Sequence, residues 1–194
     1  MPLAPEIKSF LETAAAAGLP QVWEAPIEVI RRNTQSRPAL AGTPEPLFEV
    51  TNRFIPGPTA DLPIRIYRPS KVSDRTIVYF HGGGYVVQSA NSHRKVAAHL
   101  ALQSNRNVLS VNYRLAPEHA HPAAVNDAVL AYQWLLNAGY ASNKIAISGD
   151  SAGGGLSVAL MVALKNQKIE QPAGAVVFSP WVDLEGTGES MDSK

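Results

Sequence analysis

One serine lies in a pattern that could present it as a nucleophile. The pentapeptide Gly149-Asp150-Ser151-Ala152-Gly153 lies between an apolar run at 144–148, which predicts a buried strand, and a segment at 151–165 that predicts a helix. A serine on such a tight turn takes a strained conformation with its hydroxyl exposed, and the glycines avoid clashes with the strand and helix. The helix start also directs N–H groups and the positive dipole end toward the site. The alternative interpretation is a tight turn with a serine that caps the helix.

A run of glycines upstream supplies a second candidate part of the same site. His81-Gly82-Gly83-Gly84 follows a predicted buried strand at 76–80. Consecutive glycines leave backbone N–H groups unobstructed, and acyl transfer needs such donors because its tetrahedral intermediate carries negative charge on the former carbonyl oxygen. Loss of one donor typically costs about 3–4 kcal/mol of transition-state stabilisation. The alternatives are a loop of no special purpose and a phosphate-binding loop, but Tyr85-Val86-Val87 lacks the Lys-Ser/Thr pair of the latter.

A third segment, Tyr113-Arg114-Leu115-Ala116-Pro117-Glu118, follows a predicted strand at 107–111. By itself it predicts an ordered loop in which Arg114 and Glu118 could pair with each other. A structural role is the favoured interpretation.

The spacing of apolar residues predicts the elements that position these segments. Residues 47–55 and 62–67 alternate apolar and polar side chains around a Pro-Gly-Pro turn, which predicts an antiparallel pair. Buried strands then alternate with helices, which predicts right-handed crossovers and a mostly parallel sheet with helices on both faces. These strands are expected at 76–80, 107–111, 144–148 and 173–178, and the helices at 95–102, 122–136 and 151–165.

The first 45 residues predict a separate N-terminal part. Helical spacing of apolar residues predicts helices over 6–17 and 22–32, followed by a Pro- and Gly-containing linker from 37 to 46. Two helices cannot bury both apolar faces by themselves, so we expect residues 1–45 to pack on the core formed by residues 46–194.

Composition excludes several classes of protein. The 194 residues carry a net charge of +1, which disfavours a nucleic-acid or acidic-membrane partner. There is no cysteine, which excludes disulfides, thiolate catalysis and cysteine-based metal sites. No apolar run approaches the ~20 residues of a membrane span, and the first residues do not predict a signal peptide. We therefore expect a cytoplasmic protein.

The segments H-G-G-G, Y-R-L-A-P-E and G-D-S-A-G-G, in this order, resemble the hormone-sensitive-lipase-like family of α/β-hydrolases, the bacterial family IV esterases and lipases. The resemblance extends over nearly the whole chain, as far as Ser179–Leu184. It implies an α/β-hydrolase fold with N-terminal cap helices over an acyl pocket. It also implies hydrolysis of small-molecule carboxylic esters, often with short acyl chains, without a metal or other cofactor.

The resemblance also implies roles for individual residues. Ser151 would be the nucleophile, on an elbow formed with Gly149, Asp150 and Gly153. The oxyanion hole and its support would comprise the backbone N–H groups of Gly83, Gly84 and Ala152, and the supporting residues His81 and Gly82.

The general base and the acid that such a serine needs are not found after it. In this superfamily the chain order is serine, acid, histidine, yet all five histidines precede Ser151, namely His81, His93, His99, His119 and His121. Asp183 comes directly after the strand at 173–178 and is interpreted as a turn or cap residue. A base from His119-Ala120-His121 is conceivable, but these are interpreted as loop histidines.

We therefore expect the N-terminal part of an ester hydrolase, ending before its acid and histidine, with weak or no activity of its own. The alternative is a non-catalytic ligand-binding or regulatory protein of the same family, as the gibberellin receptors are. The apolar strand at 173–178 is expected at a sheet edge, where unpaired backbone groups favour self-association.

Overall fold

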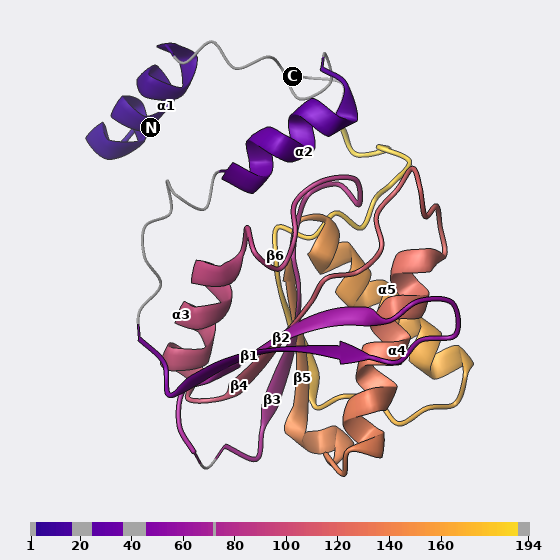
Figure 1. The fold of residues 1–194 in the computed structure, drawn as a ribbon. Coiled ribbons are helices and arrows are strands. Elements are labelled where there is room, and N and C mark those ends of the chain that lie inside the picture. Colours follow the sequence, from indigo (N-terminus) through magenta and orange to yellow (C-terminus); the bar gives the residue numbers. More distant parts are fainter. Residues whose placement is uncertain (1–2, 17–24, 37–45, 72, 190–194) are drawn as a thin grey trace.

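A six-stranded mixed sheet forms the centre of the computed structural model, which describes residues 3–16, 25–36, 46–71 and 73–189 (Figure 1). The strand order is β1-β2-β4-β3-β5-β6. The strands are β1 (Glu49–Ile55), β2 (Leu62–Arg68), β3 (Thr76–Phe80), β4 (Asn107–Val111), β5 (Ile145–Asp150) and β6 (Gly174–Phe178). The helices are α1 (Pro5–Ala16), α2 (Ile27–Ser36), α3 (Arg94–Ser104), α4 (Ala123–Asn137) and α5 (Ala152–Asn166), with a 3-10 turn at Ser142–Lys144.

The strand pairing confirms the predicted fold class. β1 and β2 form the expected antiparallel hairpin, and β2 also pairs antiparallel with β4. β4, β3, β5 and β6 run parallel to one another. Because parallel strands end at the same edge of a sheet, the loops after β3, β4, β5 and β6 all lie at one edge, where both glycine-rich segments follow their strands.

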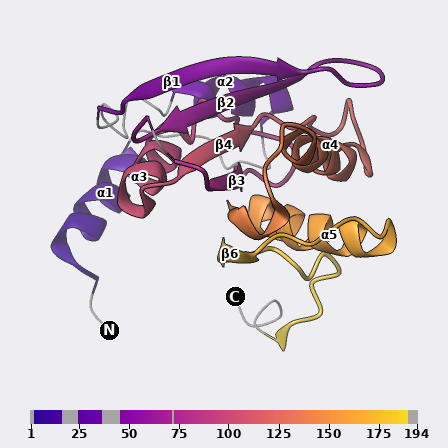
Figure 2. The ribbon, with the colours of Figure 1, turned by 90° about the horizontal axis from the view of Figure 1, so that it is seen from below.

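Helices cover both faces of the sheet, as the alternation of strands and helices predicts. α4 and α5 pack against one face, in a core that includes Val78 and Phe80 of β3, and α3 packs against the other face, next to Tyr79 (Figure 2). Successive β3 side chains thus point to opposite layers. α3 approaches closely because its buried positions Ala97, Ala98 and Ala101 are small.

The last strand differs from the expectation of a strand buried on both faces. Val176 and Phe178 of β6 are 64% and 51% exposed. β6 is the outermost strand of the described sheet and pairs only with β5 there. Its apolar residues are therefore covered less than those of β3, β4 and β5.

The N-terminal helices also differ from the sequence expectation. The helix predicted over 22–32 begins at Ile27 and continues to Ser36. Pro26 directly precedes its first residue, and the Pro26 carbonyl accepts hydrogen bonds from the N–H groups of Val29 and Ile30. The start of the predicted helix, 22–24, and residues 37–45 of the linker predicted over 37–46 lie outside the described residues. The sequence predicts that the apolar face of α1 packs on the core. This is wrong for Ile7 and Leu11, which are about half exposed, because α1 lies apart from the sheet (Figure 1). Within the described ranges, no helix has the length and hydropathy needed to span a bilayer.

Candidate active site

Ser151 occupies a strained turn between β5 and α5. Its backbone angles are φ 53° and ψ −120°, a combination that costs a non-glycine residue on the order of 1–3 kcal/mol. The residue is exposed, and its side chain makes no capping hydrogen bond to the helix. The geometry therefore contradicts the interpretation of Ser151 as a helix-capping serine and leaves its hydroxyl accessible for chemistry.

Two glycines allow this turn to approach the end of β3. A Cβ atom on Gly153 would lie 2.1 Å from the carbonyl oxygen of Phe80 and 2.6 Å from that of His81. A Cβ atom on Gly149 would lie 2.3 Å from the carbonyl oxygen of Gly153. Only glycine fits at either position, so Ser151 is brought directly beside the loop that follows β3.

Backbone hydrogen bonds with the end of β6, with the segment after it and within α5 hold the strained turn in place. The Ser151 N–H donates to the carbonyl of Phe178 at 2.9 Å, and the Trp181 N–H donates to the Ser151 carbonyl at 2.9 Å. The Gly155 N–H donates to the same carbonyl at 3.0 Å. Strain at one residue persists when several neighbours determine its position, and these contacts do so for Ser151.

The glycine run after β3 forms a second tight turn. Gly83 and Gly84 have φ angles of 117° and 60°, which L side chains rarely adopt. The N–H groups of Val86 and Val87 donate to the Gly83 carbonyl at 3.1 and 3.0 Å. Since Phe80 pairs with Gly149 in the parallel register of β3 and β5, this loop and Ser151 emerge from neighbouring strands at the same edge.

Asp150 joins the two turns. Its Oδ1 accepts a hydrogen bond from the Gly82 N–H at 3.1 Å and another from the Tyr79 hydroxyl at 2.6 Å, while His93 Nε2 lies 3.4 Å from Oδ2. Burial raises the pKa of Asp150, but the hydrogen bonds from His93 and Tyr79 outweigh it and place the pKa below its ordinary value. The carboxylate is therefore ionised at neutral pH. Sequence reasoning found Asp150 as an elbow residue but missed Tyr79 and His93, whose partners lie far along the chain.

His81 is buried beneath the glycine loop. It is fully buried, and its Nδ1 lies 2.7 Å from the Gly82 carbonyl, which requires the proton on Nδ1. Its ring stacks on Tyr113 at 4.3 Å, and the Tyr113 hydroxyl donates to the His81 carbonyl at 2.7 Å. Burial lowers the pKa of His81 to about 4. A neutral, enclosed imidazole with these contacts can support the loop.

A model of the alpha/beta hydrolase fold family matches residues 77–194. The chain belongs to this family. An acetyl-hydrolase of Streptomyces hygroscopicus is 44% identical to this chain over 127 residues, 66% of this chain and 42% of that protein. An arylesterase of Saccharolobus solfataricus is 32% identical over 197 residues, 99% of this chain and 64% of that protein.

Solved esterase structures share the fold of this chain. An esterase from the archaeon Pyrobaculum calidifontis matches with a TM-score of 0.89 and 34% identity, covering 98% of this chain and 63% of that chain. An esterase from the bacterial hormone-sensitive lipase family matches with a TM-score of 0.86 and 36% identity, covering 98% of this chain and 62% of that chain. The expected fold and the resemblance to this family are confirmed. The chain spans less than two thirds of the length of each of these relatives.

The possible pairing of Arg114 with Glu118 does not form. Arg114 instead binds the buried carboxylate of Asp127 on α4, with an Nη2–Oδ1 distance of 2.8 Å. Glu118 pairs with Arg31 of α2, with an Nη1–Oε1 distance of 2.6 Å. Sequence reasoning had no signal for Arg31, because it lies 87 residues before its partner.

The remaining candidates for base and acid lie in other surroundings. His119 and His121 line a cavity of about 290 Å³ together with Tyr85 and Leu184. Within the described residues, no hydrogen bond joins either histidine to Ser151. Asp183 accepts hydrogen bonds from the N–H groups of Glu185, Gly186 and Thr187, which confirms it as a turn residue.

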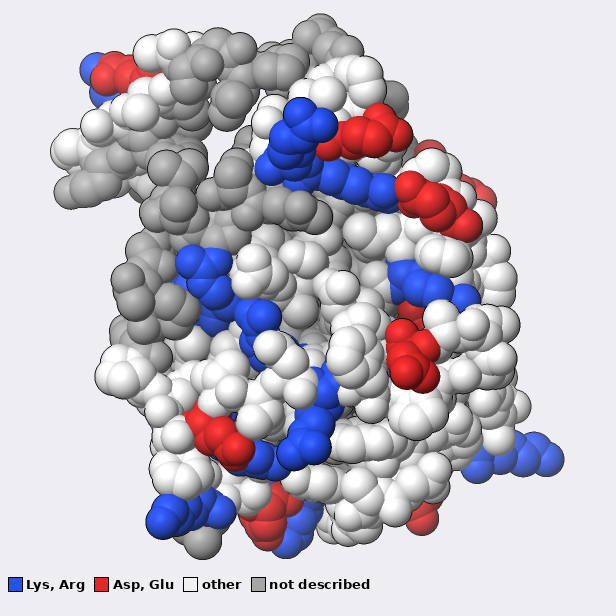
Figure 3. All heavy atoms as spheres, viewed as in Figure 1, with Lys and Arg blue, Asp and Glu red and all other residues white. Residues whose placement is uncertain are grey.

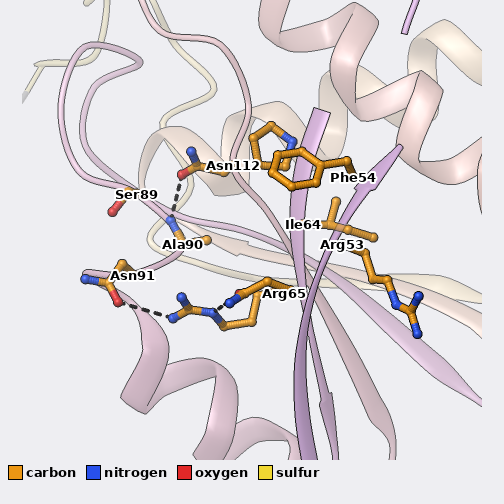
Figure 4. A pocket seen from close by; sticks show the side chains of 10 residues that line it. Arg53, Phe54, Ile64, Arg65, Ser89, Ala90, Asn91 and Asn112 are labelled. Carbon is orange, nitrogen blue, oxygen red and sulfur yellow. Dashed lines mark hydrogen bonds between the residues drawn. The ribbon is translucent and has the colours of Figure 1, made fainter. Parts of the chain in front are cut away.

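A separate hollow of about 650 Å³ lies between the β1–β2 hairpin and residues 89–91 (Figure 4). Arg65 on its wall already donates hydrogen bonds to the side-chain oxygens of Asn52 and Asn91, at 2.8 and 3.2 Å. The side-chain oxygen of Asn112 accepts a hydrogen bond from the Ala90 N–H at 3.1 Å. The lining contains no acid, histidine or strained serine that could catalyse a reaction, so Ser151 stays the candidate site.

Basic and acidic side chains lie next to one another over much of the face in Figure 3, without one dominant sign.

Proposed function

We propose that this chain carries the nucleophile and the oxyanion loop of a carboxylic ester hydrolase. The observation that carries the proposal is Ser151, exposed at a strained turn beside the loop of Gly83 and Gly84. In the proposed reaction the Ser151 oxygen attacks the ester carbonyl, and the N–H groups of Gly83, Gly84 and Ala152 stabilise the negative charge. The alcohol leaves, and water then hydrolyses the acyl-enzyme.

The described histidines next to this site have other partners. His81 is enclosed with a pKa of about 4, and His93 contacts Ser92 and Asp150. No histidine follows Ser151 among the 194 residues. Removing the base of a serine hydrolase lowers turnover by about 10⁶, while the oxyanion hole and binding retain about 10³–10⁴ over water. We therefore expect weak hydrolysis by this chain itself.

Turnover of p-nitrophenyl butyrate and covalent labelling by a fluorophosphonate test the proposal. We expect turnover far below the roughly 10 s⁻¹ of typical enzymes and loss of it in Ser151→Ala. Because no base activates the serine, we expect a slowly formed mass-spectrometric adduct on the peptide that contains Ser151. The matched control is Ser73→Ala, a serine in the loop before β3, which should keep wild-type turnover and labelling. An adduct on another residue, or equal turnover in Ser151→Ala, would contradict the proposal.

We also propose that residues 1–45 form part of a cap and that residues 46–194 form the core. Support comes from α2, which lies beside the loop after β3 (Figure 1) and contacts it through Arg31. The substrates proposed are small carboxylic esters with short acyl chains, and the proposed location is cytoplasmic.

The exposed edge of β6 supports a proposal of self-association. Val176 and Phe178 expose apolar surface beside the outer backbone edge of this strand, and such edges favour pairing between chains. Sedimentation velocity of the wild type and of Val176→Lys tests this, because a lysine on the edge strand should shift the distribution toward monomer. A concentration-independent wild-type monomer would contradict it.

A further inference from the structure

The glycine loop holds more backbone strain than its glycines explain. Besides Gly83 and Gly84, the non-glycine residues Tyr85 and Gln88 have positive φ angles of 63° and 72°. L residues adopt this region unfavourably, so contacts from outside the loop must stabilise the conformation. The backbone between these two residues is therefore the place to look for such contacts.

A single side chain from α2 makes that contact. Arg31 Nε donates to the Val86 carbonyl at 2.8 Å, and Val86 lies between the two strained residues. Arg31 Nη2 donates to the Ala116 carbonyl at 2.7 Å, while the Ala116 N–H donates to the Tyr85 carbonyl at 2.9 Å. The guanidinium thus holds the glycine loop directly and again through the loop that follows β4.

Glu118 orients this guanidinium. Its carboxylate accepts from Arg31 Nη1 at 2.6 Å and from Nη2 at 2.8 Å. The hydrogen bond from Arg31 lowers the pKa of Glu118 to about 2, so the pair is charged throughout the neutral range. A planar guanidinium can bind a carboxylate with two donors and still direct Nε to a carbonyl, whereas an ammonium group cannot satisfy this geometry.

We propose that Arg31 is a positioning residue, which fixes the proposed oxyanion loop through its hydrogen bond to Val86. The position of α2 is thereby coupled to the position of the backbone N–H groups beside Ser151. The functional part of this inference rests on the proposed ester hydrolysis. Its structural part does not, because the order of the loop can be measured without a reaction.

Hydrogen exchange and Ser151 labelling test the proposal in four variants of the chain. In Arg31→Gln we expect amides at 83–88 to exchange at least tenfold faster, with β4 amides at 107–111 unchanged, and fluorophosphonate labelling of Ser151 to slow about tenfold. Arg31→Lys should not restore either property. Arg32→Gln is the matched control, because Arg32 is the exposed neighbour on the same helix, and it should match the wild type in both.

Several outcomes would overturn the proposal. Exchange that accelerates equally in the loop and in β4 would mean global destabilisation, and exchange that changes only in α2 would mean that Arg31 anchors the helix alone. Glu118→Gln removes the carboxylate that orients Arg31 but leaves both carbonyl acceptors, so its effect on the loop should not exceed that of Arg31→Gln; a larger effect would contradict the proposal. If wild-type Ser151 does not react with the probe, the proposed function fails, while the exchange measurements still decide whether Arg31 orders the loop.

Discussion

Replacement of Gly153 by alanine tests the close approach on which the site depends. The added Cβ would lie 2.1 Å from the Phe80 carbonyl oxygen and 2.6 Å from that of His81. Both contacts are with backbone, which cannot rotate away as a flexible side chain could. Overpacking of a tight interior costs about 1–3 kcal/mol, and contacts this short place Gly153→Ala at the upper end.

A second effect opposes this cost. Gly153 lies in the first turn of α5, and alanine is favoured over glycine in helices by up to about 1 kcal/mol. The clash exceeds this gain, so we expect Gly153→Ala to lower the free energy of unfolding by about 2 kcal/mol. The displaced turn should also slow fluorophosphonate labelling of Ser151.

Urea unfolding followed by circular dichroism measures the change. The control is Gly174→Ala in β6, where an added Cβ would have no atom within 4 Å, and it should change stability by less than about 1 kcal/mol. A loss below about 0.5 kcal/mol in Gly153→Ala, or equal losses in the two variants, would refute the argument that this glycine is required by close packing against β3.

Two further predictions concern buried charge. The pKa of His81 is lowered by burial to about 4, from about 6.5 in the unfolded chain, so the unfolded state binds more protons between these values. Stability should therefore fall as pH falls from about 6.5 to 4, by roughly 1.4 kcal/mol per pH unit from this group. His81→Gln should flatten that slope, and an unchanged slope would contradict the assignment. Asp127→Asn should cost about 3 kcal/mol, because it leaves the Arg114 guanidinium without its buried partner. Lys144→Gln, which removes the exposed pair with Asp74, should leave the unfolding midpoint nearly unchanged in the same thermal or urea unfolding experiment.

Local patterns were sufficient for most of the fold. The period of two in residues 47–67 indicated the hairpin of β1 and β2, and the apolar runs at 76–80 and 107–111 match β3 and β4 in the structure. The G-x-S-x-G segment identified the turn at Ser151, because a strand, a helix and the small residues between them are consecutive in the chain. Each of these features depends on neighbours within a few residues, which a sequence states directly.

Long-range pairing was decided only by the tertiary structure. The contacts of Arg31 with Val86 and Glu118 join segments that are 55 and 87 residues apart. The contact of Tyr79 with Asp150 spans 71 residues. By sequence, Arg114 and Glu118 could pair with each other. In the structure, α2 brings Arg31 to Glu118, and α4 brings Asp127 to Arg114.

The sequence by itself therefore determined the nucleophile candidate, the glycine loop and the order of strands and helices, because hydrophobic period and glycine geometry are local properties. The tertiary structure alone decided what holds that loop, which carboxylate each arginine binds and how far β6 is covered. Those outcomes depend on which surfaces the folded sheet and helices bring together, and side chains far apart in the chain become partners only when packing places their charges and donors within hydrogen-bond distance.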